Sequence, residues 1–123
     1  MAVPRVSKDE LKRRLDAASP SAPLIVDVRL KYPYEHSTLT LPGAIRIAPG
    51  ALDPSSLPLD RDIVLYDSDP EELVSSNIAR ELQKSGYRVA VLAGGIAEWL
   101  AAKYPTDSKP APQPAAIGGS LKG

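Results

Sequence analysis

The stretch that decides the fold is Ile63-Val64-Leu65-Tyr66-Asp67-Ser68-Asp69-Pro70-Glu71-Glu72. Four apolar residues predict a buried strand, and an acidic loop follows the strand directly. Asp69 as an N-cap with Pro70 at the first helical position predicts that a helix begins inside this loop. In α/β proteins ligands and nucleophiles lie at such strand-to-helix turns, because the free N–H groups of the helix point into them. The turn is therefore the candidate functional site.

The segment after this turn predicts a βαβ unit. Val74, Ile78 and Leu82 recur at helical spacing and give one apolar face over a helix of residues 70–85. Gly86 is a typical residue after a helix, and an apolar strand over 88–92 follows it. A strand, a helix and a strand in this order predict a parallel sheet with a right-handed crossover.

The remaining elements are predicted from the same kinds of signal. Ser7 followed by Glu10 is a capping box, and Leu11 and Leu15 continue it as a helix. Strands are predicted over 24–28 and 44–47, an irregular segment over 29–41, and at most a single helical turn within 49–61. Gly94-Gly95 predicts a tight turn before a short helix over 96–102, with its inward residues Ile96, Trp99 and Leu100.

The chain length of 123 residues fits one domain, which we expect over residues 4–106. Residues 107–123 are rich in proline and glycine and predict a disordered tail. An alternative is that this tail tethers a partner domain in a longer protein.

Composition excludes several classes of function. Fifteen basic and fifteen acidic residues cancel, so the sequence predicts neither nucleic acid nor a membrane as a partner. No apolar run approaches the roughly 18 residues that span a bilayer, and we expect a cytoplasmic protein. The absence of cysteine excludes thiolate chemistry, and the single histidine, His36, excludes a multi-histidine zinc site. No metal and no cofactor is predicted.

Three motifs in the right order resemble those of the rhodanese family. Asp27-Val28-Arg29 resembles the family's D-x-R signature, and Leu41-Pro42-Gly43-Ala44-Ile45 resembles its H-I-P-G-A segment. The most specific match is Leu92-Ala93-Gly94-Gly95-Ile96-Ala97-Glu98-Trp99 with Tyr104-Pro105, similar to the L-x-G-G-x-x-x-W…Y-P ending. The resemblance covers residues 5–106 and implies an α/β fold with a central, mostly parallel sheet of about five short strands and helices on both faces.

The resemblance also implies where the reactive group would lie. The family's sulfur-carrying cysteine matches Asp67, and the second cysteine of a long-loop variant matches Asp69. The family's Gly-His before Ile-Pro-Gly-Ala is Leu39-Thr40 in this chain. Sulfur transfer needs a thiolate that forms an S–S bond and then releases it, which a carboxylate does not do. We therefore expect a catalytically silent domain, a pseudoenzyme, that acts as a binding or regulatory module.

The predicted binding residues lie in the loop 67–76, where the partner would be another protein or a small ligand. They are Asp67, Ser68, Asp69, Glu71, Glu72, Leu73, Val74 and Ser75, together with Asp27 and Arg29, which the resemblance places near the rim. For each residue a purely structural role stays open. In that case Asp67 would accept hydrogen bonds from the backbone N–H groups of the loop, and Asp69 would cap the helix. Glu71 and Glu72 would lie on the surface, and Asp27 and Arg29 would form a structural pair.

Two alternative functions remain open. Asp67-x-Asp69 after an apolar strand resembles the first motif of haloacid-dehalogenase-type phosphatases, whose carboxylates bind Mg²⁺ and attack phosphorus. Helix capping already explains Asp69, however, and the rhodanese motifs cover the same residues. The other alternative is a sulfurtransferase in family name only.

Overall fold

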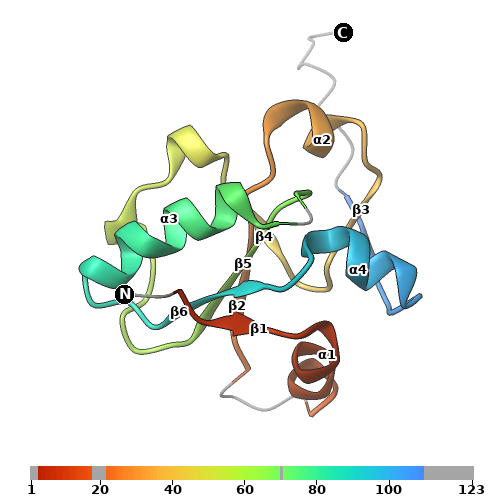
Figure 1. The fold of residues 1–123 in the computed structure, drawn as a ribbon, viewed down its shortest axis with the longest axis horizontal. Coiled ribbons are helices and arrows are strands. Elements are labelled where there is room, and N and C mark those ends of the chain that lie inside the picture. The colour runs from red at the N-terminus through yellow and green to blue at the C-terminus, as the bar shows by residue number, and fades with distance from the viewer. Residues whose placement is uncertain (1–2, 18–21, 70, 110–123) are drawn as a thin grey trace, which may run out of the picture.

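Five parallel strands form the centre of the structure, a computed structural model that describes residues 3–17, 22–69 and 71–109 (Figure 1). The strands are β1 (Arg5–Val6), β2 (Leu24–Asp27), β4 (Ile45–Arg46), β5 (Ile63–Tyr66) and β6 (Val89–Leu92). Their spatial order is β1-β6-β5-β2-β4, and every neighbouring pair is parallel. All carboxyl ends therefore meet at one edge of the sheet, where the acidic loop after β5 begins.

Helices cover both faces of this sheet, which confirms the predicted fold class (Figure 1). On one face α1 (Lys8–Asp16) and α4 (Gly95–Ala101) bury Leu11, Ile96 and Trp99 against β5 and β6. On the other face lie α3 (Leu73–Lys84) and the two 3₁₀ turns Pro49–Ala51 and Pro54–Ser56. The core strands β2, β5 and β6 are apolar on both sides, because each side packs under helices.

The segment 29–41 is more ordered than the sequence predicts. It contains the short helix α2 (Lys31–Glu35) and the strand β3 (Leu39–Thr40). β3 pairs antiparallel with β7 (Asp107–Ser108), and the Lys109 N–H donates to the Thr38 carbonyl at 2.8 Å. The first residues of the predicted tail are thus part of the fold. The rest of that tail, residues 110–123, lies outside the described residues.

Most element predictions are confirmed locally. The Ser7 hydroxyl caps α1 by accepting the Glu10 N–H at 3.1 Å. Trp99 is fully buried, and its Nε1–H donates to the Pro105 carbonyl at 2.8 Å. Leu100, predicted to face inward, is 39% exposed, so that part of the prediction is wrong.

A buried ion pair lies at the carboxyl end of β2, and a hydrogen bond from Tyr66 connects it to β5. Arg29 donates from Nε and Nη2 to Asp27 at 2.6–3.0 Å, and both side chains are almost fully buried. The Tyr66 hydroxyl donates to Asp27 Oδ2 at 2.9 Å and accepts the Leu41 N–H at 3.3 Å. Burial, and then the charge of Asp27, raise the pKa of Tyr66, so the phenol stays protonated as a donor. The predicted structural pairing of Asp27 and Arg29 is confirmed.

We predict that Tyr66→Phe lowers the free energy of unfolding by about 1–2 kcal/mol, because it leaves buried polar partners unpaired. The Asp27 carboxylate then loses one donor, and the Leu41 N–H loses its acceptor. Urea denaturation measures the change. The control is Tyr32→Phe, at a tyrosine that is 66% exposed, for which we expect a change within about 0.5 kcal/mol. Equal effects of the two substitutions would contradict the proposed role of the Tyr66 hydroxyl.

Candidate functional site

Asp67 occupies the hollow between the end of β5 and the beginning of α3. The residue is 1% exposed, and its two carboxylate oxygens accept different backbone N–H groups. Oδ1 accepts the Asp69 N–H at 2.9 Å, and Oδ2 accepts the Ser75 N–H at 2.6 Å. Hydrogen bonds to an ionised acceptor are short and strong. The bond from the Ser75 N–H comes from the first turn of α3, where the helix dipole also favours a negative charge. The loop therefore carries its own anion.

Glu72 is the second carboxylate that the loop turns inward. The sequence predicts a binding residue, or alternatively a surface residue, yet Glu72 is only 4% exposed and has a left-handed backbone with φ of 57°. Arg5 donates to both of its oxygens at 2.7 and 2.9 Å, and the Gly94 N–H donates to Oε2 at 2.9 Å. Burial opposes ionisation of Glu72, but Arg5 and the Gly94 N–H outweigh it and hold the pKa below its usual value. One side chain thus joins the loop to β1 and to the turn before α4.

The beginning of α3 differs from the sequence prediction. The helix begins at Leu73 with Glu72 as its N-cap residue, not in the loop at residue 70. Asp69 caps the turn before the helix: its Oδ1 accepts the Glu71 N–H at 2.8 Å, and its carbonyl accepts the Glu72 N–H at 3.0 Å. The contacts of Glu72 with Arg5 and Gly94 fix it in a conformation that a helix interior does not allow, so the helix cannot begin earlier. Pro70 lies outside the described residues.

Gly95, the first residue of α4, packs directly against the loop after β5. Gly95 has φ of +66°, and a Cβ on it would lie 2.6 Å from the Asp67 carbonyl oxygen. The Ile96 N–H donates to that same carbonyl at 3.0 Å. The predicted tight turn at Gly94-Gly95 is confirmed, and its reason is close backbone approach.

The predicted binding residues separate into two groups. Asp67, Glu72 and Ser75 are buried and contact the protein itself. Asp27 and Arg29 are also buried, and within the described residues they pair with each other, Leu39 and Tyr66 rather than with the loop 67–76. The accessible side chains among the predicted residues of the loop are Ser68, Asp69, Glu71, Leu73 and Val74, of which Leu73 is 59% exposed. Sequence reasoning missed Arg5, because a two-residue edge strand has no periodicity to reveal it.

The acidic residues of the loop do not converge on a common point. Within residues 3–17, 22–69 and 71–109, no group of three or more His, Asp or Glu side chains is arranged to hold a metal ion. Asp67 and Glu72 direct their oxygens to different donors: the Asp69 and Ser75 N–H groups for Asp67, and Arg5 and the Gly94 N–H for Glu72. The arrangement differs from the shared oxygen cluster that Mg²⁺-dependent phosphoryl transfer needs.

The strand order, the loop and the glycine turn agree with one family, whose description matches residues 7–102 as Rhodanese-like domain. The chain belongs to the rhodanese-like domain family. A tRNA sulfurtransferase of Desulfurococcus amylolyticus is 35% identical over 82 residues, which are 67% of this chain and 16% of that protein. The chain thus spans about one sixth of the length of this curated relative.

Solved structures share the rhodanese-like fold. A full-length protein from Lactobacillus plantarum has a TM-score of 0.76 at 19% identity, over 85% of this chain and 88% of that chain. A rhodanese-like domain protein from Staphylococcus aureus has a TM-score of 0.67 at 22% identity, over 79% and 91% of the two chains. At these identities the likeness concerns the fold alone. In the described residues no helix is long and apolar enough to cross a membrane.

We predict that Gly95→Ala lowers the free energy of unfolding by about 1–3 kcal/mol, because a Cβ would collide with the Asp67 carbonyl. The matched control is Gly50→Ala, since a Cβ there has nothing within 4 Å. Urea denaturation compares the two variants, and amide shifts of residues 67–76 report the loop. If both variants are as stable as the wild type, Gly95 does not limit the packing of the loop.

The Glu72 contacts predict a dependence of stability on pH. Because the folded-state pKa of Glu72 is lowered, its contribution is present above the unfolded-state pKa and disappears as the pH falls through the folded value. We therefore expect Glu72→Gln to be less stable than the wild type at neutral pH, with the difference shrinking toward about pH 3. Glu71→Gln, at an exposed neighbour, is the control and should show no such dependence. Denaturation at several pH values measures the difference, and a constant difference would contradict the assignment.

Proposed function

We propose that this rhodanese-like domain does not carry sulfur and instead works as a binding or regulatory module. The observation that carries the proposal is the buried Asp67 carboxylate, which fills the hollow after β5 and uses both oxygens on backbone N–H groups. A thiolate at this position would be the sulfur carrier in the family that the motifs resemble. A carboxylate oxygen has no comparable route to an S–S bond and its release.

Electrostatics support the same proposal. Donors such as thiosulfate are anions, and they would meet the Asp67 charge inside the hollow and the Asp69 and Glu71 charges around it. Two like charges at 4 Å repel by about 1 kcal/mol in water and about 4 kcal/mol near a protein surface. The attraction of a helix amino end for an anion is about 0.3–1 kcal/mol, so the repulsion is the larger effect.

The binding surface that fits this proposal is the outer side of the loop. Ser68, Asp69, Glu71 and Val74 are at least partly accessible, and Leu73 adds an exposed apolar side chain. The residues beneath them are held by Asp67 and by the contacts of Glu72 with Arg5 and Gly94. A surface of acidic and apolar groups on a fixed backbone suits recognition by another protein or a small ligand, because little conformational entropy is lost on binding.

A sulfurtransferase assay with thiosulfate and cyanide tests the proposal, together with intact-mass measurement after treatment with the donor. We expect turnover at the background rate and no added mass of a sulfur atom, because the chain contains no thiol. Asp67→Ala is the control variant for any residual rate. Turnover that depends on Asp67, or a stable sulfur adduct on the wild-type chain, would overturn the proposal and favour a sulfurtransferase like the tRNA sulfurtransferase relative.

A further inference from the structure

A cavity of about 220 Å³ lies at the carboxyl ends of β2 and β4, where α2 and the β3–β7 pair approach the sheet. Asp27 and Arg46 are partners in the parallel register of β2 and β4, so their side chains lie on the same face of the sheet. The residues that line the cavity are Asp27, Tyr34, Thr40, Ala44, Ile45, Arg46, Asp107 and Ser108. None of these residues belongs to the loop 67–76, so the cavity is separate from the surface of the proposed function.

Arg46 is held in place by the protein through only part of its guanidinium. Its Nη1 donates to the Arg29 carbonyl at 2.6 Å and to the Asp27 carbonyl at 3.4 Å, and lies 3.6 Å from Asp27 Oδ1. Its guanidinium carbon lies 4.0 Å from the centroid of the Tyr34 ring. Among the described residues, Nε and Nη2 of Arg46 have no hydrogen-bond partner. The side chain is 23% exposed, so solvent or a ligand can reach it.

The unused edge of Arg46 is a fork for an oxyanion. Nε–H and one Nη2–H are parallel donors, and this pair matches the two oxygens of a carboxylate. The contacts of Nη1 and the Tyr34 ring fix the fork before a ligand arrives, so little conformational entropy is lost on binding. The buried Arg29 differs, because its Nε and Nη2 both donate to Asp27 and Nη2 also donates to the Leu39 carbonyl.

The charged side chains around the cavity leave one positive charge unbalanced. Arg29 and Asp27 form a buried pair whose charges cancel. Asp107 lines the cavity, and its charge is offset by Lys109, whose Nζ lies 4.3 Å from the centroid of the Tyr34 ring. The charge of the fork therefore remains for a ligand. A monoanion balances this charge, whereas a dianion such as sulfate would bring one negative charge too many.

We propose that this cavity binds a small monocarboxylate, whose two oxygens accept Nε–H and Nη2–H of Arg46 and whose short apolar body lies beside Ala44. The volume is below the range of about 300–1,000 Å³ that is usual for ligand pockets, so the ligand has only a few carbon atoms. A cation would meet the charge of Arg46. A neutral amide would offer the fork one oxygen in place of two.

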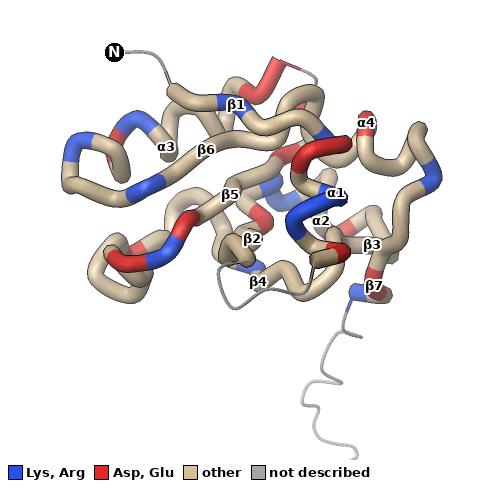
Figure 2. The backbone as a smooth tube through the Cα atoms, turned by 90° about the horizontal axis from the view of Figure 1, so that it is seen from below, with Lys and Arg blue, Asp and Glu red and all other residues tan. Residues whose placement is uncertain are grey.

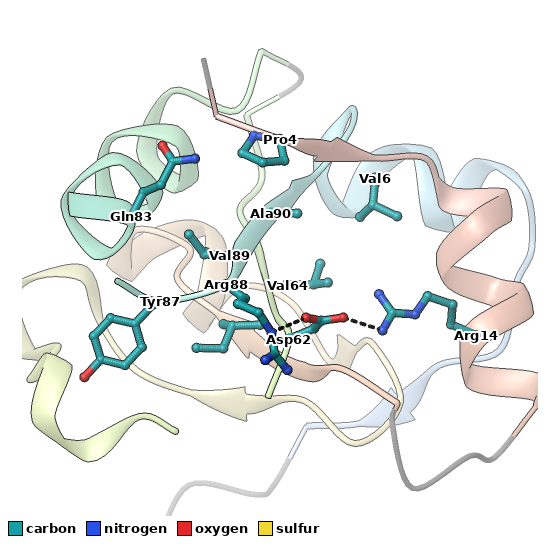
Figure 3. Close-up of a pocket in the computed structure, with 11 residues that line it drawn as sticks. Pro4, Val6, Arg14, Asp62, Val64, Gln83, Tyr87, Arg88, Val89 and Ala90 are labelled. Atoms are coloured by element: carbon teal, nitrogen blue, oxygen red, sulfur yellow. Dashed lines mark hydrogen bonds and ion pairs between the residues drawn. The ribbon is translucent and has the colours of Figure 1, made fainter. Parts of the chain in front are cut away.

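The cavity at the amino ends of β5 and β6 offers an anion less, although its volume is about 310 Å³ (Figure 3). Asp62 accepts Arg88 Nε–H and Arg14 Nη2–H there, both at 2.9 Å (Figure 3). Arg88 also donates from Nη2 to the Asp60 carbonyl at 3.0 Å, and Arg14 has a further interaction within the protein. Both arginines are thus engaged, and we expect the carboxylate at Arg46 instead.

The test uses propionate as the probe, with propionamide and sulfate as comparison ligands. Titration followed by NMR should give saturable shifts of the Arg46 Nε–H signal and of the Ala44 and Ser108 amides, with a dissociation constant on the order of millimolar. Propionamide and sulfate should bind at least about tenfold more weakly, because each lacks either the second charged contact or the matching charge. Absence of saturation, equal binding of either comparison ligand, or shifts centred on the loop after β5 or on the cavity of Figure 3 would overturn the proposal.

Arg46→Lys separates the fork from its charge. Lysine keeps the charge but has no pair of parallel donors, so propionate should bind about tenfold more weakly. Arg80→Lys is the matched control, because Arg80 lies exposed on α3 and contacts Asn77, and it should bind propionate like the wild type. Circular dichroism melts establish that each variant is folded. A folded Arg46→Lys with unchanged affinity would contradict the assignment, and if this variant does not fold, the comparison of propionate with propionamide on the wild type decides.

Discussion

The acceptance of two backbone N–H groups by the Asp67 carboxylate determines the shape of the loop after β5. The Asp69 N–H lies two residues along the chain and the Ser75 N–H lies in the first turn of α3, so one side chain closes the loop onto the helix. Hydrogen bonds to a charged acceptor contribute about 1.5–3 kcal/mol each, and the buried donors would otherwise be unpaired. The backbone of Asp67 accepts Ile96 as well, which places α4 against the same point.

A second carboxylate extends this constraint across the carboxyl edge of the sheet. Glu72 contacts Arg5 on β1 and Gly94 before α4, so elements from both termini of the described domain meet at α3. Its left-handed backbone is unfavourable for a residue with a side chain, and the three hydrogen bonds compensate for that strain. Basic and acidic residues are interspersed along the described backbone (Figure 2), and Arg5–Glu72 and Arg29–Asp27 are local pairs of this kind.

The sequence predicts the elements whose signals are local. The βαβ unit, the Ser7 cap and the Gly94-Gly95 turn depend on patterns within a few residues, and all are confirmed. The position of Asp67 also follows from the sequence, because a strand end fixes it. The orientation of Glu72 does not, since it depends on Arg5, which is 67 residues away in the chain. Short elements such as α2 (five residues) and β3 (two residues) escape prediction for the same reason: tertiary contacts hold them, and they are too short for a hydrophobic pattern to repeat.

A negative charge at the position of Asp67 explains how such a loop can keep its fold without a thiolate. A carboxylate and a thiolate both bring one negative charge to the donors at the beginning of a helix, so the backbone can keep the same direction with either group. What differs is the chemistry of the atom: sulfur exchanges bonds with sulfur, whereas a carboxylate oxygen does not form an S–S bond that it can later release. The fold therefore depends on the charge at this position, whereas sulfur transfer depends on the element that carries it. Under the proposed function, a chain that keeps the charge and loses the sulfur uses its defined loop surface for recognition.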